Sequence, residues 1–292
     1  MLRRSRFLLA LPHVVLGALA LQPSAAQAVD CGYDYTSGEA IFAGAGPSIW
    51  ETTADEAEFE DGLIVQGALA RQDAFDDYGR ATINGTGYTN PDTNGCNRGD
   101  SNRTLAYPTD EGLITDVDVT PQLYVSGKHP FGRVYVAIKN TDTSPVTLDF
   151  KFDGDLGADS DAVEDRSSAG GNGMTAGDRW VTTCEDGDDD GCSNTKNERV
   201  RDPEIAHNWE GKDGSESVDD VGAPEAQGGD LDVTFENVSI PAGKTIAFMQ
   251  VATLATKIKG ARKAADAIDK NPQGYGVFDG LSDKEKSRIK NW

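Results

Sequence analysis

The sequence is poor in the residue types on which most catalytic and metal centres depend. It has 3 histidines, 4 cysteines and 3 methionines among 292 residues. Beyond the N-terminus only His129 and His207 remain, and neither lies in a spacing typical of a zinc site. A G-x-S-x-G nucleophile elbow is absent, and no carboxylate pair stands out from so many acids as a glycosidase pair. The sequence therefore gives little support to hydrolytic catalysis, and it names no substrate.

Long apolar runs are also missing, except at the N-terminus. There Arg3, Arg4 and Arg6 precede the mostly apolar run Phe7–Leu21, and Ala26–Ala28 forms a small-residue cleavage site. This pattern predicts a secretory signal peptide, residues 1–28, cleaved after Ala28. A twin-arginine signal fits less well, because Phe7 lies further from the arginine pair than such signals place it. Since no later segment approaches the roughly 20 apolar residues of a membrane span, we expect a secreted, extracellular protein of bacterial type with no membrane span.

Basic residues are outnumbered by acids, 27 to 49, which gives a net charge of -22, or -25 once the three leader arginines are removed. Such a charge makes nucleic acid and anionic membranes poor partners. Divalent cations and cationic surfaces fit better as partners. Adaptation to high salt explains the acidic runs equally well, so the composition leaves both alternatives open.

The cysteines are few but even in number, and all lie beyond the leader: Cys31, Cys96, Cys184 and Cys192. In an oxidising compartment this pattern predicts two disulfide bonds. Four cysteines allow three pairings. Proximity in sequence favours Cys184 with Cys192, which leaves Cys31 with Cys96. Lipidation of Cys31 is disfavoured because Asp30 precedes it where a small residue is required.

Alternating apolar and polar residues indicate an all-β fold. Val146–Phe152, Thr115–Thr120 and Asp230–Glu236 place their apolar side chains on one face, which only a strand does. Arg133–Lys139 and Thr245–Leu254 are more continuously apolar, as expected for strands covered on both faces. We therefore predict an antiparallel β-sandwich spanning residues 29–256.

Turn residues organise the rest of this domain. The polar segment Asn140–Pro145 separates two strong strands by a few residues and predicts a hairpin. Between residues 153 and 229 the composition changes to Asp, Gly, Ser and Asn, and only Arg179–Thr183 has a strand pattern. We expect a long, polar, loop-rich insertion there. Loops of that length usually bind something or lack order.

The last part of the chain, residues 257–292, has a helical pattern. Ile258, Ala261, Ala265 and Ile268 recur at helical spacing and define one apolar stripe. Further on, Ser282–Glu285 has the sequence of a capping box and predicts a short final helix. We expect these helices to pack on an edge or end of the sandwich.

The stretch C-E-D-G-D-D-D-G-C, residues 184–192, is the most distinctive in the sequence. Asp186, Asp188, Asp190 and Gly191 form D-x-D-x-D-G, the front half of a calcium loop. It resembles the short acidic calcium loops of thrombospondin type 3 repeats and dockerins over about a dozen residues, and the resemblance implies calcium bound by these aspartates. The twelfth position departs from the full motif, because it is Asn197 instead of glutamate. A solvated acidic turn remains the alternative.

A second acidic cluster begins where a strong strand ends. Asp153, Asp155, Asp159 and Asp161 lie on the predicted loop that leaves the sheet, a common position for a structural cation. The glycines between them also suit an ordinary polar turn. We therefore regard the four aspartates as a second candidate calcium site.

Aromatic residues near glycines offer a route to carbohydrate binding. Trp209 and Tyr88 are the candidates for rings that stack on sugar faces, whereas Trp50 and Trp180 fit core positions better.

Together these features predict a secreted noncatalytic β-sandwich, binding or structural, stabilised by calcium, with carbohydrate or a cell-surface component as its partner. The alternative is a secreted polysaccharide-acting hydrolase or a carbohydrate-binding protein. A cleft that combines Trp209 or Tyr88 with two carboxylates roughly 5 to 10 Å apart would favour the hydrolase.

Overall fold

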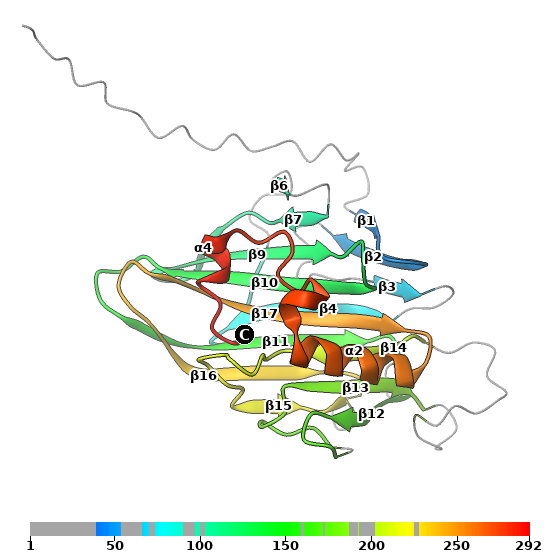
Figure 1. Cartoon of the computed structure of the whole chain (residues 1–292). Helices are drawn as coiled ribbons and strands as arrows, with labels where there is room; N and C mark the ends of the chain where they lie inside the picture. Colours follow the sequence, from blue (N-terminus) through cyan, green and yellow to red (C-terminus); the bar gives the residue numbers. More distant parts are fainter. Residues whose placement is uncertain are drawn as a thin grey trace, which may run out of the picture.

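The computed structural model describes residues 39–53, 66–69, 74–89, 97–99, 103–158, 161–171, 173–186, 192, 202–224 and 228–292. The predicted signal peptide and the predicted Cys31–Cys96 pair lie outside the described residues. Within them, two large antiparallel sheets pack face to face and a small three-stranded sheet lies beside them (Figure 1). The predicted antiparallel β-sandwich is confirmed.

The larger sheet has nine described strands. Their order is β12 (Ala162–Ser167), β13 (Trp180–Glu185), β14 (Glu204–Asn208), β17 (Thr245–Ala255), β10 (Phe131–Asn140), β9 (Val117–Val125), β7 (Thr104–Ala106) and β6 (Asn97–Gly99), with β8 (Asp110–Ile114) also paired with β9. The second sheet has the order β15 (Asp220–Gly222), β16 (Asp232–Ile240), β11 (Val146–Leu156), β4 (Phe75–Ile83) and β5 (Thr86–Gly87). The small sheet consists of β1 (Glu39–Ala43), β2 (Ser48–Thr53) and β3 (Gln66–Leu69).

The main core lies between the two large sheets. Phe150 and Phe152 of β11 point inward, and Phe150 stacks on Phe248 of β17 with ring centroids 4.6 Å apart. Phe235 of β16 packs against the same Phe248 ring, also at 4.6 Å. The alternation seen in the sequence therefore has the predicted cause, because alternate side chains of β11 and β16 enter this core on both sides of a β-bulge.

The predicted hairpin at Asn140–Pro145 is wrong. β10 pairs with β9 and β17, whereas β11 pairs with β16 and β4, so this turn carries the chain from one sheet to the other. The turn from β16 to β17 makes the reverse crossing. The buried Asn140 side chain holds the two crossings together, since its Nδ2 donates to the carbonyl oxygens of Ser144 at 2.8 Å and Ile240 at 2.9 Å.

The segment 153–229 is more regular than expected, because β12, β13, β14 and β15 all lie in it. All five residues of β14 are buried, including the polar His207 and Asn208. Buried polar side chains break the apolar pattern from which strands are predicted. The loop-rich interpretation missed these strands for that reason.

A buried polar network joins the two sheets. His207 of β14 accepts or donates at both ring nitrogens, with the Tyr78 hydroxyl 2.8 Å from Nδ1 and the Thr183 hydroxyl 2.9 Å from Nε2. Gln250 of β17 donates to the same Tyr78 oxygen. Because His207 is completely buried, desolvation lowers its pKa to about 3, and the ring is neutral at pH 7.

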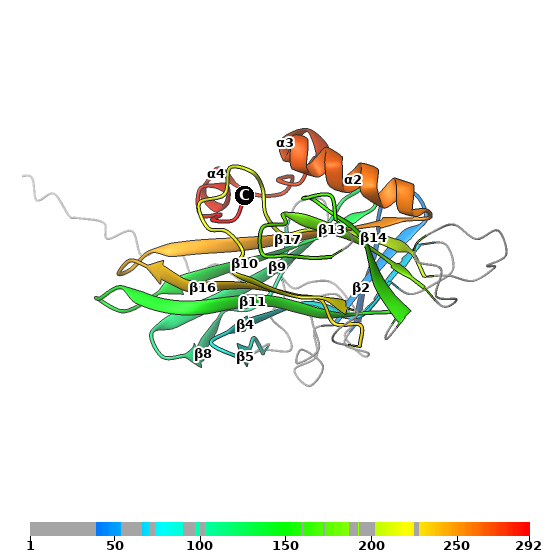
Figure 2. The same cartoon turned by 90° about the horizontal axis from the view of Figure 1, so that it is seen from below.

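The helices lie on the outer face of the nine-stranded sheet, on the opposite side of the molecule from β4 and β11 (Figure 2). They are α2 (Ile258–Lys270), α3 (Pro272–Tyr275) and α4 (Asp283–Lys286). The predicted stripe of α2 is buried and packs against β13, β14 and β17, so the helix covers a face and not an edge or end as expected. The predicted capping box is present, formed by Ser282 and Glu285.

Among the described residues, none of the helices has the length and apolar character of a membrane span.

Candidate functional site

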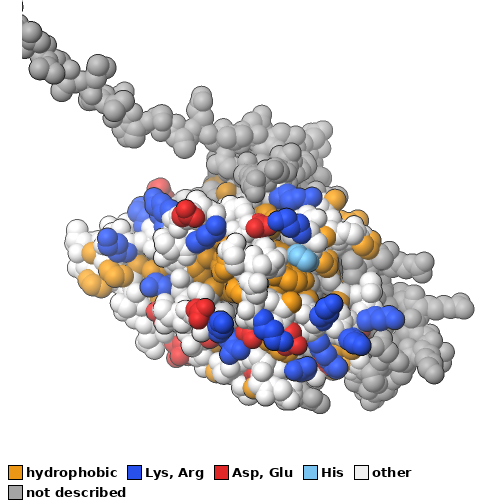
Figure 3. Space-filling model, viewed as in Figure 1, with side chains coloured by type: hydrophobic (Ala, Val, Ile, Leu, Met, Phe, Trp, Pro, Cys, Tyr) orange, Lys and Arg blue, Asp and Glu red, His pale blue; other side chains and the backbone are white. Residues whose placement is uncertain are grey.

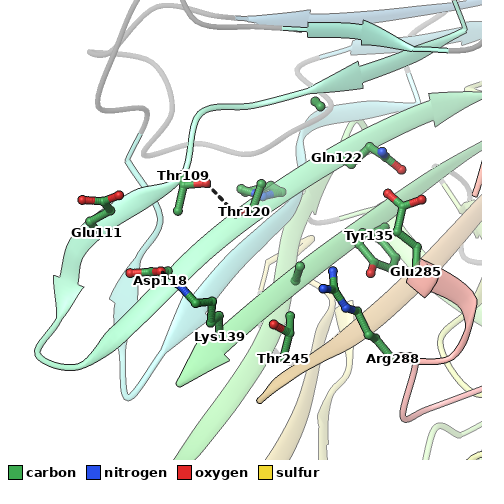
Figure 4. A pocket seen from close by; sticks show the side chains of 13 residues that line it. Thr109, Glu111, Asp118, Thr120, Gln122, Tyr135, Lys139, Thr245, Glu285 and Arg288 are labelled. Carbon is green, nitrogen blue, oxygen red and sulfur yellow. Dashed lines mark hydrogen bonds and ion pairs between the residues drawn. The ribbon is translucent and has the colours of Figure 1, made fainter. Parts of the chain in front are cut away.

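A pocket of about 400 Å³ opens on the outer face of the nine-stranded sheet where the helices leave it uncovered (Figure 4). We call it the sheet pocket. It is lined by Ala106, Thr109, Glu111, Asp118, Thr120, Pro121, Gln122, Tyr135, Ala137, Lys139, Thr245, Glu285 and Arg288.

The floor of the sheet pocket comes from two neighbouring strands. In β9, Asp118, Thr120 and Gln122 alternate with inward apolar residues, so all three point outward. They pair in register with Lys139, Ala137 and Tyr135 of β10, respectively. The small side chain of Ala137 leaves a depression at the centre of this row.

Two walls rise from the floor. Thr109 and Glu111 come from the chain around the start of β8, and the Thr109 hydroxyl lies 2.8 Å from the Thr120 hydroxyl. On the other side, Glu285 and Arg288 come from the C-terminal segment, and Figure 4 shows both side chains beside Tyr135. The site therefore combines residues more than 170 positions apart in the sequence.

The C-terminal wall is held at both ends by buried side chains. Arg133 of β10 is completely buried, and its Nη1 donates to the carbonyl oxygens of Val277 and Asp279, each at 2.7 Å. Near the C-terminus, the buried Asn291 donates to the carbonyl oxygens of Trp209 and Met249 at 2.6 and 2.7 Å. α4 and Arg288 lie between these two anchors.

Backbone pairing fixes the position of Arg288 more closely. The Ala247 amide of β17 donates to the Arg288 carbonyl oxygen at 2.8 Å, and the Lys290 amide donates back to the Ala247 carbonyl oxygen at 2.9 Å. This short parallel bridge continues the sheet by one strand-like segment. The wall is therefore part of the fold, and its charged side chains are presented from a fixed backbone.

Both signs of charge meet in the sheet pocket. Asp118 forms an ion pair with Lys139 at 2.6 Å across the floor. Burial raises the pKa of Tyr135 to about 12; the nearby Glu285 carboxylate also raises it, whereas Arg288 lowers it. At neutral pH the phenol is therefore protonated and can donate a hydrogen bond.

A second concave region lies on the outer face of the five-stranded sheet. We call it the acidic hollow; its volume is about 300 Å³ and its lining is Asp77, Arg80, Lys151, Asp153, Gly154, Asp155, Asp230 and Asp232. A hollow of about 520 Å³ adjoins it, shares Arg80, Lys151 and Asp153, and includes Tyr88.

The acidic hollow contains two of the predicted calcium ligands, Asp153 and Asp155. Asp153 is only 4% exposed and already pairs with two cations, Arg80 at 2.5 Å and Lys151 at 2.7 Å. Lys151 also reaches Asp232 at 3.3 Å. Among the described residues, no group of three or more His, Cys, Asp or Glu side chains is placed to hold a metal ion. Metal binding by these aspartates stays a prediction.

Two further predicted calcium ligands, Asp161 and Asp186, lie near each other at the end of the β12–β13 pair. The Asp186 amide donates to the Asp161 carbonyl oxygen at 2.8 Å. Asp159, Asp188 and Asp190 lie outside the described residues. The predicted disulfide between Cys184 and Cys192 is confirmed, with the Cα atoms 5.7 Å apart.

The two predicted stacking rings are not at the surface. Trp209 is completely buried, and its indole Nε1 donates to the Asp178 carbonyl oxygen at 2.7 Å. Tyr88 is 2% exposed, and its hydroxyl donates to the Pro108 carbonyl oxygen at 2.7 Å. The structure thus corrects the expectation of exposed rings, because polar partners inside the fold satisfy both side chains. Trp50 and Trp180 are buried, as predicted.

Sequence reasoning missed the lining of the sheet pocket. One signal was available: Asp118, Thr120 and Gln122 form an uninterrupted polar row on a strand whose other face is apolar. Nothing in the sequence indicates that Glu285 and Arg288 lie above that row.

Comparison with known proteins places the chain in no family. No family profile and no curated protein matches it. Among solved structures, it is similar to a galactose mutarotase-like protein from Lactobacillus casei, with 8% identity, a TM-score of 0.45, and coverage of 74% of this chain and 100% of that one. A heparan sulfate lyase from Pedobacter heparinus has 11% identity and a TM-score of 0.44; the match covers 71% of this chain and 33% of the lyase. The chain thus spans about a third of the lyase's length. With TM-scores below 0.5, these likenesses carry no argument about function.

Proposed function

We propose that the sheet pocket binds an uncharged, hydroxyl-rich ligand of the carbohydrate type, and that the protein is a binding module. One observation carries the proposal: hydrogen-bond donors and acceptors converge from two strands and the C-terminal wall around the space above Ala137. Each hydroxyl of a sugar both donates and accepts, so a sugar site needs both kinds of partner.

The lining supplies both kinds. Its acceptors include the carboxylates of Glu111 and Glu285, its donors include Arg288, and Gln122 offers one of each. Planar groups such as guanidinium and carboxylate pair with two neighbouring hydroxyls at once. The volume of about 400 Å³ lies within the roughly 300 to 1,000 Å³ of small-ligand pockets.

The charge balance favours a neutral ligand. Three carboxylates, of Glu111, Asp118 and Glu285, face two cations, Lys139 and Arg288. A sulfated or uronate-rich polymer would meet carboxylate repulsion at this site and from a chain of net charge -22. We therefore expect neutral oligosaccharides to bind more tightly than acidic ones.

Within the part of the chain that the structure describes, the lining has three carboxylates, the groups that glycosidases use, but no other common nucleophile or base. Its described members include no histidine, cysteine or serine. Tyr135, with its pKa at about 12, is a poor general base at neutral pH. It is suited to donating a hydrogen bond to a bound hydroxyl.

Isothermal titration against a panel of neutral and acidic oligosaccharides tests the proposal. Ala137→Phe should fill the depression and weaken binding by about tenfold or more, a loss of about 1.4 kcal/mol. Thr147→Phe is the matched control, because Thr147 is an exposed strand residue on the other sheet and its change should leave affinity unaltered. Absence of binding by the natural protein, or equal binding by Ala137→Phe, would refute the proposal.

A polysaccharide hydrolase is the second candidate, with its chemistry at the acidic hollow. Asp232 favours it: burial raises the pKa of its carboxyl, as a general acid requires. The Asp153 and Asp230 carboxylates also raise it, whereas the nearby Lys151 lowers it. Tyr88 lines the adjoining hollow. The test is release of reducing ends from neutral polysaccharides. Activity that Asp232→Asn abolishes while Ala137→Phe leaves it unchanged would favour the hydrolase.

A further inference from the structure

The chain carries its basic residues unevenly. Residues 257–292 contain 9 Lys and Arg against 5 Asp and Glu, whereas the preceding 256 residues contain 18 against 44. One end of a strongly acidic chain is therefore basic. The segment lies on the outer face of the nine-stranded sheet, and Figure 3 shows Lys and Arg side chains gathered on that side of the molecule.

Three lysines of α2 form what we call the basic ridge: Lys259, Lys263 and Lys270. They are exposed and lie on one stripe of the helix, because separations of 4 and 11 residues are close to whole turns of about 3.6 residues. None of the three forms an ion pair with a residue that the structure describes.

The arginines around α2 are used differently. Arg262 pairs with Asp165 of β12, and Arg179 pairs through two nitrogens with Asp269 of α2, at 2.7 and 3.0 Å. These pairs attach the helix to the sheet and occupy the nearby carboxylates. Asp165 and Asp269 therefore pair with arginines and not with the lysines of the basic ridge, which are exposed.

The opposite side of the molecule is acidic and concave. The acidic hollow has five carboxylates against Arg80 and Lys151, a formal charge of -3. It lies on the five-stranded sheet, whose outer face the described helices leave bare, and Figure 2 shows this sheet and the helices on opposite sides of the molecule. The basic ridge, which also carries Asp266 between Lys263 and Lys270, and the acidic hollow lie on opposite sides of the molecule and are complementary in charge.

We propose that the basic ridge of one molecule docks in the acidic hollow of a second copy of this chain. Two different surfaces meet in such a contact, so it is heterologous and leaves one free ridge and one free hollow at the ends. Repetition of the contact builds an open chain of molecules. This inference is independent of the sheet pocket.

The net charge dictates how assembly depends on salt. At about 0.01 M ionic strength the Debye length is about 30 Å, and the negative charge of whole molecules opposes contact. At about 0.15 M it falls to about 8 Å, which screens distant repulsion and leaves close lysine–carboxylate pairs attractive. At about 1 M, a Debye length of about 3 Å weakens those pairs too. We therefore expect assembly to be greatest at intermediate salt.

Sedimentation velocity of the full chain at these three ionic strengths measures the assembly. The ridge variant reverses three charges, Lys259→Glu, Lys263→Glu and Lys270→Glu; the hollow variant reverses two, Asp77→Lys and Asp230→Lys. Each variant alone should stay monomeric, since each has lost one of the two surfaces. Thermal unfolding of each variant checks that it is folded.

Mixing the two variants gives the decisive result. The ridge variant keeps its hollow and the hollow variant keeps its ridge, so an equimolar mixture should form assemblies that neither variant forms alone. Joining both sets of changes in one chain should restore assembly, because the charges are exchanged and not lost. A natural protein that is monomeric at all three ionic strengths overturns the proposal. So does a monomer that is retained on a heparin column only when the ridge is intact, which would assign the ridge to a polyanion.

Discussion

The outer faces of the two large sheets differ in what covers them. On the nine-stranded sheet, α2 and the C-terminal segment lie across β17 and β10, and nearly every residue of these two strands is buried. On the five-stranded sheet no described helix lies over the outer face, which we call the bare face, and β11 and β16 alternate between buried and exposed residues over most of their length. A continuous apolar strand in the sequence therefore marks a covered stretch of sheet, and alternation marks an uncovered stretch, as it does in β9 at the sheet pocket.

The difference in cover between the two sheets also explains where the candidate site lies. On the bare face, charged side chains pair with one another along the strands, as Lys151 does with Asp153 and Asp232. On the covered face, the sheet pocket forms where the cover is incomplete, so that Glu285 and Arg288 overhang the strands. A covering segment adds a wall that a bare sheet lacks.

The largest loss of stability is expected when acid protonates His207, which joins the two large sheets. His207 has a pKa of about 3 in the fold, against about 6.5 in the unfolded chain. Between these values the unfolded state binds the proton and the native state does not, so stability is complete above about pH 6.5 and falls as the pH drops toward 3. The slope is about 1.4 kcal/mol per pH unit, or roughly 4 kcal/mol by pH 3.5.

Urea unfolding at pH 7.0, 5.5 and 4.5 measures this loss. Carboxylates also titrate near the lower end, so His207→Gln serves as the reference, since it keeps a hydrogen-bonding side chain without a titrating proton. The natural protein should lose stability more steeply than the variant over this range. Equal slopes for the two proteins would mean that His207 is not buried in its neutral form.

The next largest loss of stability is expected from removal of a buried arginine on the covered face, and removal of an exposed arginine on the bare face provides the comparison. Arg133→Ala removes the buried donor to Val277 and Asp279 and should lower the free energy of unfolding by about 3 kcal/mol. Arg80→Ala, on the bare face, should lower it by about 1 kcal/mol or less, because Arg80 is 41% exposed and Lys151 still pairs with Asp153. Denaturant unfolding of both variants measures the difference; a cost for Arg80→Ala as large as that for Arg133→Ala contradicts the contrast between the faces.

The disulfide at the edge of the covered sheet should contribute slightly less to the free energy of unfolding than Arg133 does. Cys184 and Cys192 close a short loop and also pack near Ile258 and Ala261 of α2. Loop entropy gives an upper value of about 2.6 kcal/mol for the bond. The double variant Cys184→Ser and Cys192→Ser should lose about that much in thermal unfolding under nonreducing conditions. If reduction of the natural protein costs nothing, the bond contributes no stability.

Calcium binding is expected to give the smallest change in the free energy of unfolding. If the loop 184–192 binds it only in the native state, calcium at about ten times its dissociation constant adds about 1.4 kcal/mol. Replacement of Asp186, Asp188 and Asp190 by asparagine should abolish the increment. Sodium chloride at matched ionic strength is the control, and an equal increment with sodium would identify the loop as a solvated acidic turn.

Local patterns predicted much of the fold from the sequence. The strands containing Val146–Phe152 and Thr245–Leu254, the stripe of α2 and the capping box at Ser282 all depend on neighbours within a few residues. The crossing at Asn140 was not predictable in this way, because a short polar turn can join strands of one sheet or of two. The same holds for β14, whose buried His207 interrupts the apolar pattern and finds its partners in other strands.

The candidate site was less predictable than the fold. Gln122 and Tyr135 face each other only because β9 and β10 pair in that register. Glu285 joins them because Arg133 and Asn291 hold the C-terminal segment across the sheet. A carboxylate in a capping box normally indicates a helix start, and nothing local distinguishes one that also lines a pocket.

The central claim is that ligand binds on the partly covered face, beneath α4, and not on the bare face. Hydrogen exchange with and without a bound neutral oligosaccharide tests it most directly. We predict slower exchange in residues 118–122 and 283–288, and unchanged exchange in β4 and β11. Protection confined to β4 and β11 would contradict the claim and move the ligand to the acidic hollow.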